Sequence, residues 1–514
     1  MRRVSRFGGK VGRDLMTLIL YLLTFSALIL PNYNGFVNHF FVARWLFGAF
    51  FATLLVAFLY FKMRGSYVSS QHSYSTSIAI VLTIILVISW SQFFLHDEPY
   101  LRGTFDNPTG LALTILLCTP FILRSNIIQK WEFVIIVILG ISLAFTQCRC
   151  AMLWFCVYLI WHYRRRRSIL IATLIFVVSL ALIFVRKSDS TSGHWFIAQR
   201  TLELFAQSPW TGWGIHGFQR EYMTRQADWF MQHPDSAYAI LAGNIVHPYS
   251  DYLLVLVNYG LLGMAFVLGL VILIISLYKK SESLDSPFAQ ATYLLMGAAM
   301  FSYPSEYPFS WFVLAQGLIV ALHRAGTLSY VYHSRFIAGI FIPVVSLIII
   351  SFCIIDVRRQ MVWHDVYKKI QSETPSKSVE RMSLIEYQWE NDEFYLYHLA
   401  YSCLRAKEYI RCLSALKRRG LLVRDYYQEE LLGELFLELK DDLEALHHFE
   451  RASAMFPAKF YPRYQMFVLN RRMGNIDACR TIQRHVKEMP VKVPSEEADI
   501  YRRGILWDSI QIKN

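Results

Sequence analysis

Residues 247–263 read HPYSDYLLVLVNYGLLG, and the apolar run that starts here continues to about residue 277. A run of this length matches the roughly 20 apolar residues with which an α-helix crosses a bilayer. It begins with a His-Pro pair and Asp251, polar groups that are costly to bury in hydrocarbon. The stretch therefore predicts a membrane helix, at about residues 249–277, whose polar start lies at the membrane surface.

Further apolar runs of about 15 to 25 residues fill the first 355 residues, and each is close to the length of a membrane helix. The chain has 514 residues, of which 55% are hydrophobic and 17% are charged, whereas soluble proteins carry about 25% charged residues. The pattern predicts an all-α polytopic membrane protein with about eleven transmembrane helices. The predicted spans are residues 15–30, 45–61, 77–95, 107–123, 132–146, 151–162, 169–185, 249–277, 287–303, 309–322 and 336–355.

Basic residues gather in the predicted loops on one side of these spans, and the positive-inside rule assigns that side to the cytoplasm. They account for most of the formal charge of +13, so no nucleic-acid partner is needed to explain it. This topology puts the long loop 186–246 outside the cytoplasm, and eleven crossings put the C-terminal residues on the same side. The cytoplasmic basic residues are Arg2, Arg3, Arg6, Lys10, Arg13, Lys62, Arg64, Arg124, Lys130, Arg164–Arg167, Lys279, Lys280, Arg324 and Arg335.

The residues after Ile355 have the pattern of soluble amphipathic helices and contain an internal repeat. Residues 440–457 align with residues 473–490 at an offset of 33, and a weaker copy covers residues 407–420. This period resembles that of the tetratricopeptide repeat. We predict a membrane domain over 1–355 and a small α-solenoid over 356–514, whose concave surface would take a protein partner. A helical lid without a ligand is the alternative.

The chain has eight cysteines, none with the paired spacing of a zinc site, so the sequence predicts neither a disulfide framework nor a metal site. No Asp-x-Asp motif is present. We therefore expect a chain without a cofactor and, if it is an enzyme, a metal-independent reaction.

The external loop is long enough to suggest a function. Its helical stretches carry four groups that are cationic or partly cationic, and SPWTGWG (208–214) separates the stretches with proline and glycine. Gly212 and Gly214 are expected to shape the backbone of this break. The four groups are His194, Arg200, Arg220 and Arg225.

Four motifs occur in order along the chain: GTFDNPTGLA (103–112), TQCRCAM (146–152), SPWTGWGIHGF (208–218) and HPYSDYLLVLVNYGLLG. Together they resemble the O-antigen ligase and O-antigen polymerase superfamily, which shares a C-type glycosyltransferase membrane fold. FSYPSEYPF (301–309) resembles the variant with C-terminal tetratricopeptide repeats. Two positions depart from the pattern. Gly193-His194 stands where many relatives have Gly-Arg, and Ser250-Asp251 stands where relatives usually have Asn-Glu.

The resemblance implies transfer of a glycan from undecaprenyl diphosphate to an acceptor hydroxyl at the outer, periplasmic face of a bacterial inner membrane. The acceptor would be lipid A-core, a protein hydroxyl or another glycan. The last two would make the chain a protein O-oligosaccharyltransferase or a polysaccharide polymerase. A lipid-linked oligosaccharide flippase would place charges along its membrane path, but the predicted spans are almost free of charge at mid-depth. A non-catalytic scaffold would leave the polar groups of the loop without a purpose.

Within this reaction, His247 has the intrinsic pKa of a general base, and Asp251, one helical turn later, would orient its ring. Arginines make bidentate, permanently charged contacts with phosphate. Simpler roles exist for each group: a helix-start histidine, a snorkelling Arg149 and solvated arginines on the loop. Asn107 is expected to shape the start of a helix. The predicted diphosphate-binding residues are Arg149, Arg200, Arg220, Arg225 and His194.

Overall fold

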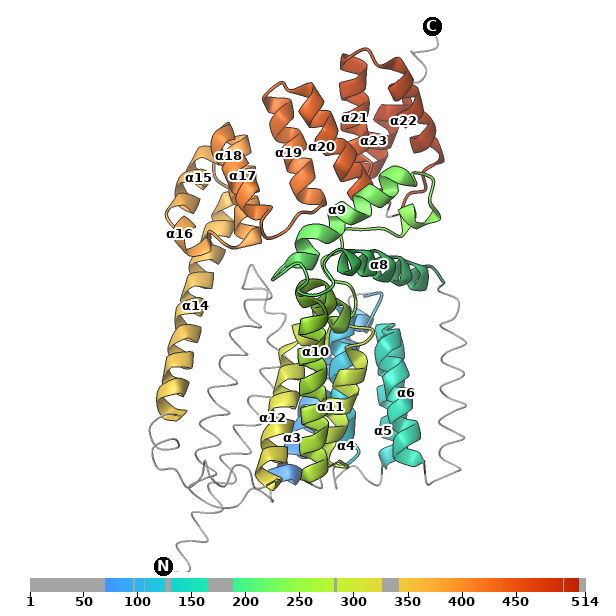
Figure 1. Cartoon of the computed structure of the whole chain (residues 1–514), viewed down its shortest axis with the longest axis vertical. Coiled ribbons are helices and arrows are strands. Elements are labelled where there is room, and N and C mark those ends of the chain that lie inside the picture. The colour runs from blue at the N-terminus through green and yellow to red at the C-terminus, as the bar shows by residue number, and fades with distance from the viewer. Residues whose placement is uncertain are drawn as a thin grey trace, which may run out of the picture. The chain divides into compact units, whose positions relative to one another are not determined.

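All regular secondary structure in the described part of the chain is helical, which confirms the predicted all-α class (Figure 1). The predicted spans at 15–30, 45–61 and 169–185 lie outside the described residues, so the count of eleven stays a prediction. The computed structural model describes residues 70–95, 98–105, 107–124, 131–164, 188–281, 284–325, 342–492 and 494–507.

The chain divides into two compact units, Met1–Val185 with Val267–His364 and Arg186–Phe266 with Asp365–Asn514. The predicted external loop is thus grouped with the C-terminal residues rather than with the apolar helices. The predicted domain boundary after residue 355 stays a prediction. Two helices, α10 (Asp251–Lys280) and α14 (Ile342–Ile370), each begin in one unit and end in the other.

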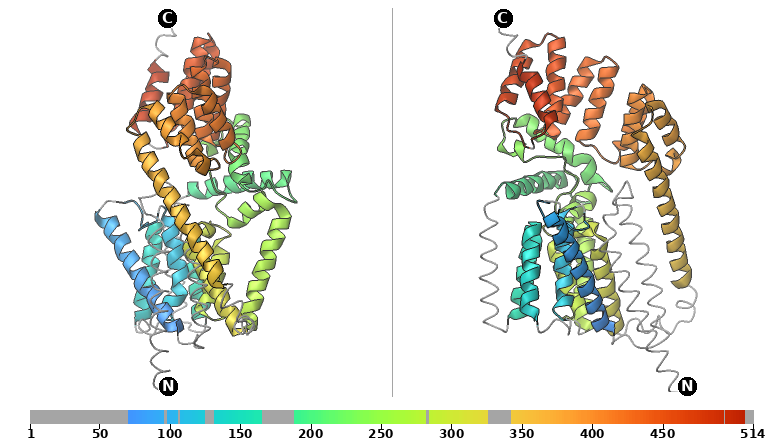
Figure 2. Two further views of the ribbon diagram at one scale, coloured as in Figure 1. Left: turned by 90° about the vertical axis from the view of Figure 1, so that its left-hand side faces the viewer. Right: turned by 180° about the vertical axis from the view of Figure 1, so that it is seen from behind.

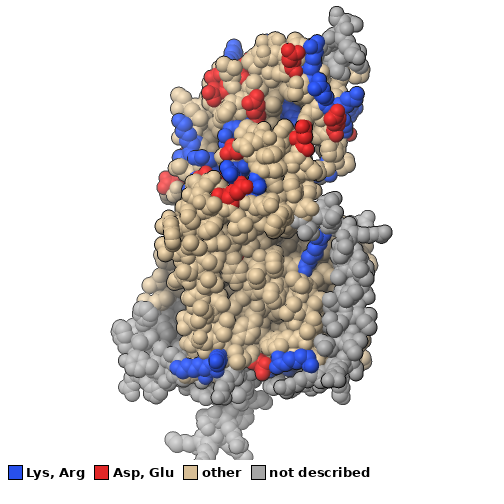
Figure 3. All heavy atoms as spheres, turned by 45° about the vertical axis from the view of Figure 1, so that its right-hand side comes forward, with Lys and Arg blue, Asp and Glu red and all other residues tan. Residues whose placement is uncertain are grey.

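The first unit is built around α4 (Pro108–Ile122), whose residues from Gly110 to Ile122 are all buried. This helix has almost no polar face, and it can be apolar on every side because neighbouring helices surround it. On the face shown in Figure 3, a broad area of uncharged side chains lies above a row of charged side chains at its lower edge. The helices that pack against α4 are α3 (Ser70–Leu95), α5 (Glu132–Thr146), α6 (Arg149–Tyr163), α11 (Pro287–Ala298) and α12 (Pro308–Arg324).

Two helices among the described residues are long and apolar enough to cross a membrane, Ser75–Leu95 within α3 and the whole of α10. The predicted span at 249–277 falls on α10. Shorter helices fall on the predicted spans at 107–123, 132–146, 151–162 and 309–322, whereas α11 ends at Ala298 and covers only the first part of the predicted span 287–303.

The second unit contains the loop helices α8 (Ser188–Gln207) and α9 (Gly217–Gln232), the short turn η3 (Ala237–Ile240) and the start of α10. Its C-terminal helices follow one another as a stack (Figures 1 and 2). These helices are α15 (Pro375–Ser383), α16 (Glu386–Trp389), α17 (Glu393–Arg405), α18 (Tyr409–Arg419), α19 (Tyr426–Glu438), α20 (Asp442–Met455), α21 (Tyr461–Arg472), α22 (Ile476–Glu488) and α23 (Glu496–Trp507).

The C-terminal helices pack in pairs, α17 with α18, α19 with α20, and α21 with α22. The two best-matched copies of the sequence repeat fall on α20 and α22. In α20 the repeat residues Ala445 and Phe449 are fully buried, as expected for the small and large residues that let two helices approach. Membership of the tetratricopeptide family stays a prediction.

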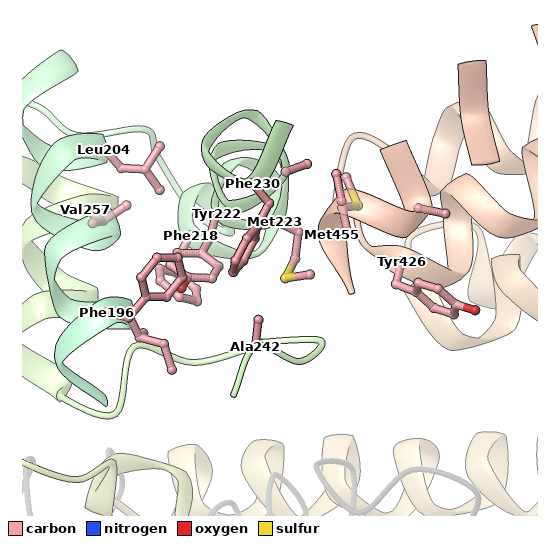
Figure 4. Packing of buried hydrophobic residues seen from close by; sticks show 14 residues of the cluster. Phe196, Leu204, Phe218, Tyr222, Met223, Phe230, Ala242, Val257, Tyr426 and Met455 are labelled. Carbon is pink, nitrogen blue, oxygen red and sulfur yellow. The ribbon is translucent and has the colours of Figure 1, made fainter. Parts of the chain in front are cut away.

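One hydrophobic cluster joins the loop helices to the C-terminal helices inside this unit. It contains Phe196 of α8, Phe218 and Phe230 of α9, and Met455 and Tyr426 of the C-terminal part, all of them buried. Figure 4 shows the side chains of the cluster from both parts of the chain. Burial of large apolar side chains is worth about 1.5–3 kcal/mol each, so the loop and the C-terminal helices hold each other in place.

Candidate functional site

The α10 helix is broken at Gly260, which has φ 63° and ψ −159°. Such a break leaves backbone groups without their helical partners, and these groups need other partners where water is scarce. The N–H groups of Trp213 and Gly214 supply two of them, donating to the carbonyls of Val257 and Asn258 at 2.8 Å each.

The other side of the break is paired in the same way. The N–H groups of Leu261 and Leu262 donate to the carbonyls of Pro209 (2.7 Å) and Trp210 (3.2 Å). The segment SPWTGWG therefore completes the broken helix, which explains why it folds as a compact turn against α10.

This close approach leaves no room for side chains at two glycines. Gly212 has φ +67°, and a Cβ there would lie 2.5 Å from the carbonyl oxygen of Val257. At Gly260 a Cβ would collide with the carbonyl of Trp210. Gly214 also has a positive φ, +82°, but a Cβ there would meet open space. The predicted loop-shaping glycines thus differ, since Gly212 is constrained by conformation and space and Gly214 by conformation alone.

His247 and Asp251 lie just before and at the start of α10. The His247 ring is buried, with 5% exposure, and its Nε2 lies 3.7 Å from Oδ1 of Asp251. The backbone N–H of Tyr249 donates to Nδ1 of His247 at 3.2 Å. Nδ1 is therefore an acceptor, and in the neutral ring the proton sits on Nε2, the nitrogen that faces Asp251.

Burial lowers the pKa of His247 to about 4. The nearby carboxylate favours the charged ring, but desolvation outweighs it. His247 is thus neutral near pH 7, and this low pKa makes it a weaker proton acceptor than the sequence suggests.

Lowering the pH to about 5 is expected to destabilise the protein through His247. The unfolded ring, with its ordinary pKa of 6.5, takes up a proton first as the pH falls. The stability due to the neutral buried ring is therefore complete above about pH 6.5 and falls toward pH 4, with a loss on the order of 2 kcal/mol by pH 5. Thermal unfolding at about pH 7 and at about pH 5 measures this loss. The variant His247→Gln should lose less, and equal losses would contradict the buried neutral ring.

Tyr249 has φ 55°, a left-handed conformation that costs a bulky residue free energy and that clusters at functional sites. Its ring contacts the ring of His194 with 4.4 Å between centroids. Burial raises the pKa of the Tyr222 hydroxyl. The charge of Arg200 lowers this pKa and Tyr249 raises it, so both residues lie near Tyr222. The structure therefore brings His194, Arg200, His247 and Asp251 into one neighbourhood through Tyr249.

Two of the predicted arginines converge on one carboxylate. Arg200 on α8 and Arg225 on α9 bind opposite oxygens of Glu203, at 2.8 Å and 3.1 Å. Arg200 also lies against the rings of Phe196 and Trp229, 5.5 Å and 5.1 Å from their centroids, an arrangement that stabilises its cation. Two guanidinium groups against one carboxylate leave an excess positive charge between the loop helices.

Arg220 has a different position. Its Nη2 donates to the carbonyl of Trp213 at 2.8 Å and its Nε to Glu221 at 2.7 Å. It thus ties the start of α9 to the SPWTGWG turn. These bonds give Arg220 a part in shaping the loop, and its predicted contact with the diphosphate stays a prediction.

Two predicted residues lie in the other compact unit. Arg149 is the first residue of α6. Asn107 caps α4, its side-chain oxygen accepting the N–H of Thr109 at 2.9 Å, and its amide donates to the hydroxyl of Tyr303 at 3.1 Å. Asn107 thus has the position of a helix-start residue.

Glu203 and Tyr249 are not among the site residues predicted from the sequence. Glu203 could have been found, because it stands three residues after Arg200 on a predicted helix. No local pattern signals the positive φ of Tyr249, because the conformation depends on the packing around it.

No group of three His, Cys, Asp or Glu in the described residues could hold a metal ion. The seven described cysteines are free. Metal independence stays a prediction.

Residues 133–268 match the model of a protein family described as O-antigen ligase. The matched range includes α5, α6, α8, α9 and the start of α10, and so every residue of the candidate site except Asn107. No curated protein matches the chain.

Proposed function

From the match of residues 133–268 to the O-antigen ligase family, we propose that the chain belongs to this superfamily and transfers a glycan from a polyprenyl diphosphate to an acceptor hydroxyl. The family supports glycan transfer of the ligase or polymerase type and a membrane-associated protein. The observation that carries the proposal is the pair His247 and Asp251 at the start of α10. This pair lies beside the strained Tyr249 and inside the matched range.

In the proposed reaction the acceptor oxygen bonds to the anomeric carbon of the donor sugar. The bond from that carbon to the diphosphate oxygen breaks, and the lipid diphosphate leaves with the bonding electrons. The acceptor hydroxyl gives its proton to a base. The Nε2–H of neutral His247 faces Asp251 at 3.7 Å, which favours Asp251 as that base. We propose that the pair closes to a hydrogen bond when substrate binds, so that His247 orients the carboxylate. These roles reverse those expected from the sequence.

The leaving diphosphate gains negative charge as the bond breaks, and fixed cations beside it stabilise that charge. Arg225 is the best candidate on the loop, because its side chain is 35% exposed whereas that of Arg200 is 12% exposed. His194, whose ring contacts that of Tyr249, is proposed as a further diphosphate ligand. Arg149 starts α6 in the other compact unit, and its role in diphosphate binding stays a prediction.

Replacing Arg225 with Ala is expected to raise KM for the lipid-linked donor at least tenfold, with a smaller change in kcat. A hydrogen bond to a charged group is worth about 1.5–3 kcal/mol, and about 1.4 kcal/mol corresponds to a factor of ten. Arg472→Ala is the control, since Arg472 pairs with Asp442 at 2.8 Å on the C-terminal helices. Donor titrations measure both, and equal KM values would contradict the role of Arg225.

The packing of the loop against the C-terminal helices supports placing both on one side of the membrane. The chain must then cross an even number of times between residues 250 and 365, and the described residues of that interval form four α-helices, α10, α11, α12 and α14. We place that side in the periplasm of a bacterial inner membrane. Labelling of single cysteines at residues 231 and 443 in intact cells tests this, and labelling of only one would contradict it.

The test of function uses purified protein, an undecaprenyl-diphosphate glycan and three acceptors in parallel: lipid A-core, a protein and a second glycan. Mass spectrometry of the products identifies the acceptor that gains the glycan. Transfer that persists in EDTA supports a metal-independent reaction. Release of no lipid diphosphate with any acceptor would overturn the proposal.

A further inference from the structure

We propose that Lys492, which follows α22, positions segment 241–246 and so holds His247 and Asp251 in register for transfer. The inference rests on the proposed function for its catalytic meaning. It assigns to the C-terminal helices a part in the reaction itself, beyond the binding of a partner.

Segment 241–246 has no helix of its own, and it leads directly into His247. The Nζ of Lys492 donates to the carbonyls of Leu241 (3.1 Å) and Ala242 (2.9 Å). The same ammonium group lies 5.6 Å from the ring centroid of Phe456. Because backbone carbonyls outside regular structure need partners, Lys492 replaces the hydrogen bonds that a helix would provide.

Gly243 and Asn244, the next residues of the segment, also bind side chains outside it. The buried amide of Gln226 donates to the carbonyl of Gly243 at 3.0 Å and to the carbonyl of Met455 at 2.6 Å. Asn244 reaches Asp425 at 3.5 Å. Gln226 belongs to α9, so one side chain joins the loop helix, the segment and α20. The path toward His247 is thus fixed by Gln226 on α9 and by Asp425 and Lys492, which stand 181 to 251 positions after their partners in the segment.

Loss of the Lys492 bonds should change the positions of His247 and Asp251 more than the affinity for the donor. Segment 241–246 contacts the C-terminal part of the chain. His247, the next residue, accepts the N–H of Tyr249 on Nδ1 and faces Asp251 with Nε2. Loss of the Lys492 bonds would let the segment shift without removing a substrate-binding group. Small displacements of reacting groups lower the rate of the chemical step far more than they weaken binding.

The test compares Lys492→Met, Lys492→Arg and Lys459→Met in the full-length protein. Lys459 is the matched control, because its Nζ lies 5.7 Å from the centroid of the same Phe456 ring but makes no described hydrogen bond to segment 241–246. We measure kcat and KM for the lipid-linked donor, and hydrogen exchange of peptides covering residues 240–249.

Lys492→Met is expected to lower kcat about tenfold or more with donor KM unchanged, and to speed exchange in residues 240–249 but not in α22. Lys492→Arg should restore most of kcat, and Lys459→Met should match the parent. Parental kcat and exchange in Lys492→Met would overturn the inference. Should that variant fail to fold, Gln226→Met takes its place, because it removes the bonds to Gly243 and Met455. The same loss of kcat and the same faster exchange in residues 240–249 are then expected. If the parent transfers no glycan, the proposed function fails, while the exchange data still decide whether Lys492 holds the segment.

Discussion

Replacing Asp251 with Asn is expected to reduce kcat about a thousandfold, with little change in KM for the lipid-linked donor. The substitution keeps the size of the side chain and removes its ability to accept a proton, and general base catalysis is worth about 10²–10⁴-fold. Asp251 lies 3.7 Å from the Nε2 of His247 and its side chain is 15% exposed, which leaves the carboxylate accessible to an acceptor hydroxyl. Steady-state transfer rates at saturating donor and acceptor measure the effect.

Two variants of His247 separate the roles of the pair. The side-chain amide of Gln can place an N–H where His247 has Nε2–H, but it cannot act as a base near pH 7. If His247 orients Asp251, His247→Gln should keep kcat within about tenfold of the parent, while His247→Ala loses about a hundredfold. Equal, near-complete inactivation by Gln and Ala, together with an active Asp251→Asn, would restore His247 as the base.

Local patterns in the sequence predict the helices well and the breaks in them poorly. The apolar run after Asp251 correctly indicates α10, because length and composition alone favour a membrane-type helix. The break at Gly260 leaves no mark in VNYGLLG, which reads as continuous helix. It forms because the turn at residues 208–214 supplies the hydrogen bonds that the helix gives up, and that pairing joins segments about 45 residues apart.

The candidate site shows the same division. Residue type predicted that the loop arginines carry positive charge, but their partners decide what that charge can do. Arg200 and Arg225 share Glu203, whereas Arg220 binds a backbone carbonyl of the turn. The attachment of the loop to α20 was also beyond local patterns, because the residues involved stand more than 200 positions apart.

Replacing Gly212 with Ala is expected to lower the free energy of unfolding by about 3 kcal/mol and to abolish transfer. A left-handed conformation costs a non-glycine residue about 1–2 kcal/mol, and a misfit in a packed region costs about 1–3 kcal/mol more. The added methyl would lie 2.5 Å from the backbone of Val257 and Asn258. It would push the turn away from the break in α10 and leave the carbonyls of the broken helix without partners.

Gly214→Ala is the matched control, because Gly214 shares the positive φ but a Cβ there meets nothing within 4 Å. It carries the conformational cost alone, about 1 kcal/mol, and should remain active. Thermal unfolding in detergent, with transfer assayed on the same samples, compares the two variants. Since the left-handed backbone conformation destabilises both variants, the difference between their free energies of unfolding isolates the contact with α10. If Gly212→Ala unfolds no earlier than Gly214→Ala, the turn does not press against the broken helix, and the pairing that places Asp251 and the loop in one unit is wrong.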